Sequence, residues 1–448
     1  MEGGSLQMMH RILSGEPLYG PPTVEFVPYT YTPLYFYLSA LASPLLGEGF
    51  LPLRAVSVIA SIAAFGLLFS IIRRETGSAI GGVAAAGLFA ATYAANGNWF
   101  DLARIDSLCL ALLLGAICLG LHGTHARHFI VGGVLVALAF FTKQVAVIVA
   151  GPLFVAVVLR NRTKGLAFAL SAVGIIGAGI LYLTTLYDNW FLFYTLTSPR
   201  TRWLSNLSWE ALSRATILEF LPIFIIPLAV AASTVWKLLS KPDSKGLSFL
   251  LVVGGLFLAA GWGRIESINF LNSSIPAHLG ISLLFGRAVG ETLRTSLTFV
   301  APLSLAGAFS LQLAILAPLA GPIIPQQKEL SNFKEYTTFL ASLPTPIYLP
   351  DHGYVTSLGR DNSFAHSIGI MDLMMGGTPE QIAQFRSEME EALSARRFRT
   401  IVCDTHLFPT WFKEALERNY SMHPNMPPQG TWIPVLGFQQ HPTIFVAR

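Results

Sequence analysis

The chain has 448 residues and a formal net charge of +4, and 53% of its residues are hydrophobic whereas only 12% are charged. Soluble globular domains carry about 25% charged residues, so this composition excludes an ordinary soluble protein. The positive excess is small for this length and is dispersed along the chain, which excludes the concentrated basic surface of a nucleic-acid-binding protein.

The first 53 residues are predicted to lie outside the hydrocarbon of a membrane. They contain one apolar stretch, YTYTPLYFYLSALASPLLG (29–47), in which the apolar residues run only from Pro33 to Gly47. A spanning helix needs about 20 residues, and tyrosines are enriched at the membrane interface. The sequence therefore predicts an outer-face segment, 1–53, that contains amphipathic interfacial helices.

Further segments are apolar and long enough, or nearly so, to cross a bilayer as helices. They are 54–72, 78–95, 105–122, 129–141, 144–159, 165–187, 217–239, 246–262, 271–287 and 296–322. We therefore predict an α-helical polytopic membrane protein with a transmembrane domain over 54–322 that contains about ten helices.

Basic residues gather in every second loop between these segments. The loops hold Arg73 and Arg74; Arg127; Arg160, Arg162 and Lys164; Lys237, Lys241 and Lys245; and Arg287 with Arg294. Cytoplasmic loops carry an excess of lysine and arginine, which assigns this set to the cytoplasm. The opposite loops, residues 1–53 and the C-terminal part are then predicted to face the extracytoplasmic side of the inner or plasma membrane.

Residues 323–448 have the composition of a soluble domain. TPIYL (345–349), RTIVCDT (399–405) and a closing pair, TWIPV (431–435) and TIFVAR (443–448), are rich in strand-forming residues. A helix is predicted from Thr378 as N-cap, with Pro379 at its first position and Gln381 completing a capping box. The sequence predicts a small extracytoplasmic α/β domain.

Three charged residues, Asp101, Arg104 and Asp106, lie together in the extracytoplasmic sequence FDLARID. If this segment is helical, Asp101 and Arg104 share a face because they are three positions apart. The three residues either anchor the loop at the interface, with an acid at a helix N-terminus, or line a pocket for an anionic headgroup. Both interpretations stay open at this point.

Two further places in the extracytoplasmic loops are polar. Lys143, in FFTKQVAV, either extends its ammonium group to the interface or supplies a point charge to a lipid phosphate. The sequence GWGRIESINF contains Arg264, Glu266 and Asn269. The middles of the predicted spans are nearly free of ionisable groups, with His278 as the main exception, and this disfavours a transporter.

The order of these sequences resembles the GT-C membrane glycosyltransferases. The shared features are an acid at the start of an outer loop, then GEPLY, YTPLYFY, FDLARIDSL, FFTKQ and INFLNSSIPAHLGISLL, over about residues 1–320. They are similar to the branch that contains protein O-mannosyltransferases, aminoarabinose transferases and rhizobial lipopolysaccharide sugar transferases. The resemblance implies a hexosyl- or pentosyltransferase that moves a sugar from a polyprenyl-phosphate donor to a glycan, lipid or protein acceptor outside the cytoplasm.

The resemblance also implies roles for individual residues. Glu2 matches the acid that deprotonates the acceptor hydroxyl. Lys143 and Arg104 first, and Arg264 next, are expected to stabilise the departing lipid phosphate. The remaining donor-binding and substrate-binding residues expected are Asp101, Asp106, Glu266, Asn269 and Tyr31. The aminoarabinose type has a lysine just before its Pro-Leu, where this chain has Tyr31 and Thr32. A divalent metal stays open, and no metal ligand is assigned.

Two other functions remain as alternatives. A non-catalytic envelope protein that binds or assembles sugar-lipids on the same scaffold would bind headgroups without turnover. A transporter would need a polar path through the centre of the bilayer. Relatives carry a transmembrane helix before the acidic loop, so we also expect about 20 to 30 upstream residues to encode such a helix.

Overall fold

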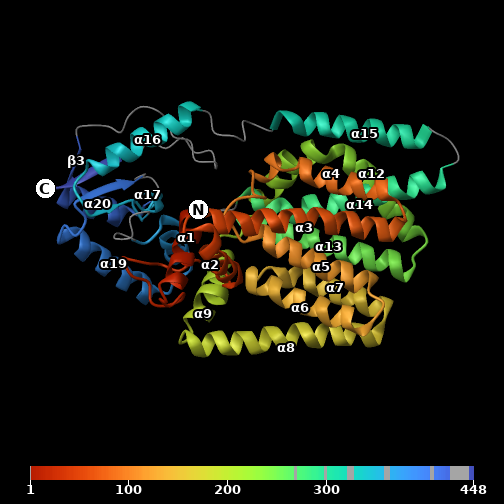
Figure 1. The fold of residues 1–448 in the computed structure, drawn as a ribbon, viewed down its shortest axis with the longest axis horizontal. Coiled ribbons are helices and arrows are strands. Elements are labelled where there is room, and N and C mark those ends of the chain that lie inside the picture. Colours follow the sequence, from red (N-terminus) through yellow and green to blue (C-terminus); the bar gives the residue numbers. More distant parts are fainter. Residues whose placement is uncertain are drawn as a thin grey trace.

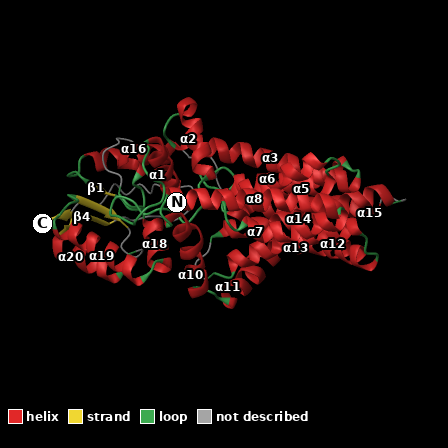
Figure 2. Cartoon of the chain, turned by 90° about the horizontal axis from the view of Figure 1, so that it is seen from below, coloured by secondary structure: helices red, strands yellow, loops and turns green. Residues whose placement is uncertain are grey.

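The computed structural model describes residues 2–266, 270–296, 300–319, 327–357, 364–403, 408–423 and 443–448. These residues form a bundle of long helices, with a small sheet and further helices at one end of it (Figures 1 and 2). The bundle helices run along the longest axis, so their loops lie at two ends. We call the end that faces the sheet, with loops 97–105 and 143–145, the proximal end, and the end with loops 123–125 and 241–243 the distal end.

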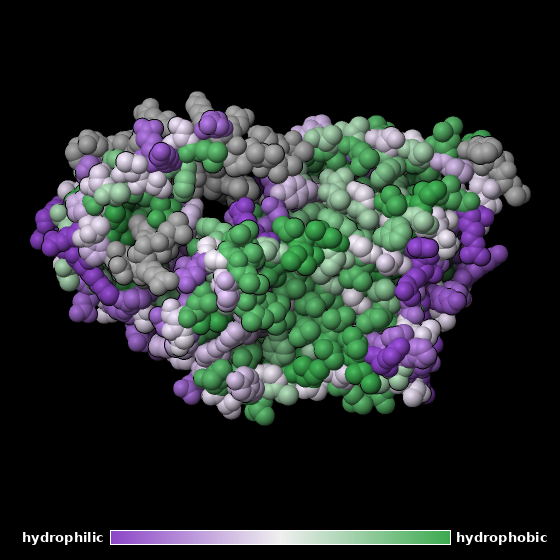
Figure 3. All heavy atoms as spheres, viewed as in Figure 1, coloured by the Kyte–Doolittle hydropathy of each residue, from purple (hydrophilic) through white to green (hydrophobic). Residues whose placement is uncertain are grey.

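Apolar helices occupy all ten predicted segments within the described part of the chain. They are α3 (Phe50–Thr76), α4 (Ala79–Ala91), α5 (Asp106–His122), α6 (Ala126–Thr142), α7 (Ala146–Arg160), α8 (Arg162–Leu186), α12 (Leu221–Ser240), α13 (Ser244–Arg264), α14 (Ile275–Thr295) and α15 (Val300–Leu316). A broad hydrophobic band covers them, with hydrophilic residues beyond it on both sides (Figure 3). The expected α-helical membrane fold with a small C-terminal sheet is confirmed.

Some of these helices are long enough to cross a membrane alone. By length and composition, the described stretches that qualify are Phe50–Thr76, Arg162–Leu186, Trp209–Ser240, Ser244–Arg264 and Val300–Leu319. The third of these joins α11 (Trp209–Arg214), the π-helical turn η3 (Ala215–Phe220) and α12, and the last adds the 3₁₀ turn η5 (Ala317–Leu319) to α15. By contrast α4, α5, α6 and α7 have 13 to 17 residues each.

Local sequence signals fix several helix ends at the distal end. Helix α3 stops at Gly77, whose φ of 74° is a left-handed conformation that glycine adopts without a steric penalty. Helices α4, α8 and α13 begin at Ser78, Asn161 and Asp243, and each of these side chains accepts a backbone N–H from the first turn. The distal turns are therefore short and specified by the sequence.

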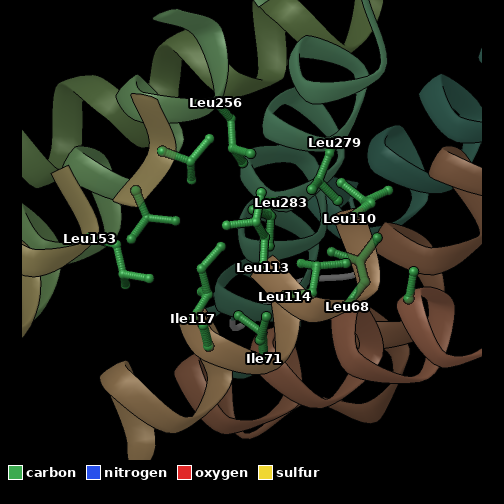
Figure 4. Packing of buried hydrophobic residues seen from close by; sticks show 14 of the residues in the cluster. Leu68, Ile71, Leu110, Leu113, Leu114, Ile117, Leu153, Leu256, Leu279 and Leu283 are labelled. Atoms are coloured by element: carbon green, nitrogen blue, oxygen red, sulfur yellow. The ribbon is translucent and has the colours of Figure 1, made fainter. Parts of the chain in front are cut away.

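Aliphatic side chains from neighbouring helices interdigitate in the centre of the bundle (Figure 4). The labelled members of this core are Leu68, Ile71, Leu110, Leu113, Leu114, Ile117, Leu153, Leu256, Leu279 and Leu283. Helices α4 and α14 approach most closely at glycines, since a Cβ on Gly81 would lie 2.7 Å from the carbonyl oxygen of Gly286. Small residues let membrane helices pack backbone to backbone in this way.

Short elements line the proximal end of the bundle. They are α1 (Glu2–Leu13), α2 (Leu34–Leu46), η1 (Ala94–Asn96), α9 (Trp190–Leu192), η2 (Phe193–Thr197), α10 (Ser198–Ser205) and η4 (Leu271–Ser274). Helix α2 buries Tyr35 and Phe36 but exposes Leu41 and Leu45. An exposed apolar face beside a hydrophobic bundle suits the membrane interface.

The C-terminal part contains a four-stranded sheet with the order β1-β2-β4-β3. Strand β1 (Ile347–Tyr348) is parallel to β2 (Thr400–Cys403), while β4 (Thr443–Ala447) is antiparallel to both β2 and β3 (Tyr420–Met422). The predicted strand at 431–435 lies outside the described residues. Helices α16 (Gln327–Ala341), α17 (Tyr354–Ser357), α18 (Ser367–Gly376), α19 (Pro379–Ser394) and α20 (Thr410–Asn419) complete this part.

Helix α19 shows how reliably a local signal can be interpreted. The side chain of Thr378 accepts the backbone N–H of Gln381, and the Gln381 side chain accepts the N–H of Thr378. This is the predicted capping box, and it is confirmed.

The N-terminal segment and the C-terminal part share one hydrophobic core. Leu6 and Met9 of α1 belong to the same buried cluster as Leu373 and Phe398. Backbone hydrogen bonding continues this packing, because the N–H of Ala365 donates to the carbonyl of Val24 at 2.9 Å. The predicted division into 1–53, 54–322 and 323–448 stays a prediction, but its first and last parts are in direct contact.

Candidate active site

Asp106 is the centre of a buried polar cluster at the proximal end. It is the first residue of α5, where helix dipoles favour a negative charge. Lys143 Nζ lies 2.7 Å from Asp106 Oδ1, Asn272 Nδ2 donates to the same oxygen at 3.0 Å, and Trp99 Nε1 donates to Oδ2 at 2.7 Å. The carboxylate is thus bound by groups from three separate segments, and it holds the loops around 99, 143 and 272 together.

Lys143 is placed there by the end of α6. It is the C-cap of that helix, its backbone is extended, and α7 begins three residues later. Burial lowers the pKa of Lys143, but the Asp106 carboxylate raises it by more, so this pKa lies above its usual value. The ammonium charge is present at neutral pH, yet it is already paired with a carboxylate.

The sequence left open whether 101–106 is helical, and the structure shows that it is not. Residues 101–105 form bends, and the helix starts only at Asp106. The condition for a shared helix face of Asp101 and Arg104 is therefore not met. Asp101 instead accepts the hydroxyl of Tyr93 at 2.6 Å, because the bent backbone separates it from the α5 helix.

Arg104 occupies the most unusual environment in the site. Its side chain is only 4% exposed, and Nη2 donates to the Tyr31 hydroxyl at 2.8 Å. Its guanidinium carbon lies 5.0, 5.7 and 5.8 Å from the ring centroids of Tyr31, Tyr29 and Trp99. Within the described ranges, its Nε and Nη1 have no hydrogen-bond partner.

The charge of Arg104 is firmly retained. Burial lowers its pKa, but Tyr31, Tyr29 and Asp106 raise it by more, so the pKa stays above its ordinary value. Two buried nitrogen donors without an acceptor lower the stability of the folded state. An anionic oxygen at either donor would satisfy it, because the planar guanidinium directs its N–H groups outward in fixed directions.

Glu2 lies next to Arg104 although the two residues are far apart in sequence. Its Oε1 accepts the backbone N–H of Ala103 at 2.7 Å. Both carboxylate oxygens also accept from Arg54, at 2.9 and 2.8 Å, in a bidentate pair. The carboxylate is fixed in position by two segments, and Ala103 joins it directly to Arg104.

A second charged cluster links the bundle to the C-terminal part. Arg202 of α10 forms ion pairs with two carboxylates. Its Nε lies 2.8 Å from Glu266 Oε1, and its Nη1 pairs with Asp372 of α18. Asp372 is 3% exposed and its Oδ2 accepts the hydroxyl of Thr30 at 3.1 Å. Burial raises the pKa of Glu266, and Arg202 only partly offsets that effect.

The polar island predicted around Arg264 and Glu266 is split. Glu266 faces Arg202, whereas Arg264 forms its ion pair with Glu219 of η3 and donates to the carbonyl of Phe270 at 3.4 Å. The two side chains diverge because α13 ends between them. Asn269 lies outside the described residues.

Several residues of the site were not predicted from the sequence, among them Arg54 and Asp372. Arg54 stood at the start of the first predicted span, where an arginine usually extends to the interface. Asp372 is the lone acid in the apolar helix SIGIMDLMMG, which was the available signal for a buried partner. No group of three or more His, Cys, Asp or Glu side chains suited to a metal occurs in the described part of the chain.

Comparisons with known proteins bear on this arrangement. A family model described as dolichyl-phosphate-mannose-protein mannosyltransferase matches residues 30–187. The structure of ArnT from Cupriavidus metallidurans bound to undecaprenyl phosphate superposes with a TM-score of 0.62 at 13% sequence identity, covering 99% of this chain and 93% of that one. The chain has the GT-C fold.

Two more structures share the GT-C fold with this chain. ArnT in the apo state gives a TM-score of 0.58 at 13% identity, with 99% of this chain and 92% of that chain covered. The Archaeoglobus fulgidus oligosaccharyltransferase, in complex with Zn and sulfate, gives 0.50 at 13% identity, covering 96% and 68%. No curated protein matches the chain. The family match contains Tyr31, Asp101, Arg104, Asp106 and Lys143.

Proposed function

We propose that this protein is a membrane glycosyltransferase that moves a sugar from a polyprenyl-phosphate donor to an acceptor on the extracytoplasmic side. The observation that carries the proposal is Arg104, a buried and permanently charged guanidinium with two unsatisfied donors, joined through Ala103 to the carboxylate of Glu2. The GT-C fold supports it, and so does the undecaprenyl phosphate bound to ArnT, a protein of the same fold.

Arg104 is the residue to which we assign the donor phosphate. Nε and Nη1 each offer an unpaired N–H to a phosphate oxygen, and the rings of Tyr29, Tyr31 and Trp99 exclude water around the guanidinium. Lys143, expected from the sequence to share this role, acts in the proposal through Asp106, which it neutralises. Arg264 has its own carboxylate in Glu219 and is placed last in this order.

Glu2 is assigned to the acceptor. In the transfer step the acceptor hydroxyl attacks the anomeric carbon of the donor sugar, and the bond from that carbon to the phosphate oxygen breaks. The proton of the hydroxyl passes to Glu2, and the negative charge of the departing polyprenyl phosphate is stabilised by Arg104. Asp101, Tyr31, Asp106 and Glu266 complete the proposed substrate-binding set, with hexosyl and pentosyl donors both compatible.

The location of the reaction follows from the charges of the loops. The proximal end holds the site, and the basic loops gather at the distal end. By the positive-inside tendency, the distal end faces the cytoplasm, and the site and the C-terminal sheet lie outside.

The test uses transfer of a labelled sugar from a polyprenyl-phosphate donor, together with binding of the polyprenyl phosphate. Arg104→Gln is expected to weaken binding about tenfold or more, since it removes a charged hydrogen-bond donor. Glu2→Gln keeps one oxygen that can accept from Arg54 Nε and the Ala103 N–H, and it is expected to leave binding unchanged while slowing transfer about 100-fold or more. Arg74→Gln at the distal end is the matched control.

A non-catalytic binding protein is the second candidate, and one observation favours it. The Glu2 carboxylate is held by Arg54 and by the Ala103 N–H, so its basic oxygens are occupied. This candidate predicts tight binding of the polyprenyl phosphate by the unmodified chain and no sugar transfer to any acceptor tested. Transfer that depends on Glu2 would exclude it.

A further inference from the structure

A groove at the distal end is built by three helices. Its volume is about 480 Å³, and α12, α14 and α15 form its walls. Helix α12 contributes Val230, Ser233, Thr234 and Lys237, which lie on one helix face because they are spaced by three, four and seven positions. We call this the distal groove.

The distal groove lies beside the less buried half of α15. The buried residues of α15 are Gln312 and Leu316, and Gln312 Nε2 donates to the carbonyl of Ile223 at 2.7 Å. The other half begins at Val300, and Val300 and Leu303 are 71% and 73% exposed. Helix α15 therefore packs most closely against its neighbours at its proximal end, and a gap remains towards the distal end.

The two ends of the distal groove differ in their lining, and the lysine lies at the distal end. Along α12 the residues run from Val230 to Lys237 towards the distal end. Along α14 they run from Ala288 to Thr292 in the same direction. Helix α15 is antiparallel to both, so its first residue, Val300, lies at the distal end and Leu305 lies at the inner end. The inner end is lined by Val230, Ala288 and Leu305, and Lys237 and Thr292 lie at the mouth beside Val300 and Ala301. The hydroxyls of Ser233, Thr234 and Ser304 lie between the two ends.

Lys237 brings a positive charge to the mouth of the groove. It is exposed, and within the described residues no carboxylate pairs with it. Trp236, its neighbour, is 74% exposed, as is common for aromatic side chains at a membrane interface. Lys241 and Lys245 follow in the sequence but do not line the groove, so Lys237 is its cationic group.

We propose that the distal groove binds a phospholipid with an anionic headgroup. A groove between membrane helices that opens on the hydrocarbon must be filled, because an empty apolar space loses van der Waals contact on one side. An acyl chain fits beside Val230, Ala288 and Leu305, and the phosphate then reaches Lys237 at the depth of the interface. Basic pockets of this kind between membrane helices select acidic lipids.

This site is separate from the proposed donor site. Arg104 and Lys143 lie at the proximal end, whereas Lys237 lies at the distal end of the same bundle. The two ligands would occupy opposite leaflets of the bilayer. The inference does not depend on sugar transfer, so it can be tested whether or not the proposed function holds.

The test is a titration of the purified full chain with phosphatidylglycerol, followed by native mass spectrometry. Lys237→Gln is expected to weaken binding about fivefold, since one lysine near an acidic surface contributes about 1 kcal/mol. Ser304→Phe fills the groove without changing its charge and is expected to weaken binding by a similar factor or more. Lys241→Gln, which removes a lysine outside the groove, is the matched control and should bind as the unmodified chain does.

Each outcome has a defined meaning. Weaker binding in both groove variants, with the control unchanged and phosphatidylethanolamine bound more weakly than phosphatidylglycerol, supports the proposal. Equal affinity of Lys237→Gln and the unmodified chain overturns it, and so does equal affinity for the two lipids. If Ser304→Phe fails to fold, the Lys237 and Lys241 variants still decide the result.

Discussion

Lys143 and the buried Asp106 form an ion pair with a 2.7 Å separation at the proximal end of the helix bundle, and the Lys143 side chain is 21% exposed. The Asp106 carboxylate also accepts hydrogen bonds from Trp99 and Asn272, which belong to two other loops. Removing one member of such a pair leaves a buried charge without compensation, whereas replacing both members removes the charge altogether. This difference separates a structural role of Lys143 from a direct role in phosphate binding.

We predict that Lys143→Gln lowers the free energy of unfolding by about 3 to 5 kcal/mol. The double variant Asp106→Asn with Lys143→Gln is expected to recover most of this loss, as measured by thermal unfolding in detergent. Binding of polyprenyl phosphate should recover with it, because Arg104 supplies the direct contact in our proposal. If binding stays lost in a folded double variant, Lys143 contacts the phosphate itself.

A methyl group at Gly286 should separate α4 from α14. Its Cβ would lie 2.5 Å from the Cβ of Ala85, and no flexible side chain is there to move aside. We expect Gly286→Ala to cost about 1 to 3 kcal/mol of unfolding free energy through overpacking. Gly66→Ala is the control, since a Cβ at that position meets nothing within 4 Å. Equal thermal stability of the two variants would contradict this account of the helix contact.

Asp372→Asn should loosen α18 from the bundle. The substitution removes the charge that pairs with Arg202, while Asn can still accept from Thr30. Loss of one partner leaves Arg202 with Glu266 alone, so we expect faster hydrogen exchange in 367–376, about tenfold or more. Arg386→Gln is the comparison, because its ion pair with Glu390 lies on the surface and such pairs contribute little. Unchanged exchange in Asp372→Asn would show that apolar packing alone holds α18.

His366 should make the stability of the protein depend on pH. Burial lowers the pKa of His366 well below its usual value of 6.5, and nearby positive charge, including Arg104, lowers it further. The folded state then holds fewer protons than the unfolded state, so stability falls as the pH drops below about 6.5, by up to about 1.4 kcal/mol per pH unit.

The comparison for this prediction is His366→Asn. The Nδ1 of His366 caps α18 by accepting the N–H of Ile368, and asparagine is also a good N-cap. Thermal unfolding between pH 7 and pH 5 is therefore expected to show a smaller loss of stability in the variant. A loss of the same size in both proteins would assign the pH dependence to other groups.

The fold was largely predictable because its signals are local. The apolar length of a membrane helix is set by the thickness of the hydrocarbon, and the capping box at Thr378 needs only three neighbouring positions. The contacts of the site are not local. Asp372 and Arg202 are 170 residues apart in sequence, and no periodic pattern connects two such positions. The sequence pointed to the loop that holds Arg104, but whether its charge is paired depends on tertiary geometry.

The contact between α1 and the C-terminal part also bears on how the protein is made. Gln7 donates to the carbonyl of Phe364 at 3.1 Å, 357 residues further along the chain. During synthesis, the apolar face of α1 is therefore exposed on one side until residues beyond 364 have been translated and delivered to the same side of the membrane. Such distant pairings form late and slowly. A chain that ends before this point would leave α1 without its packing partner.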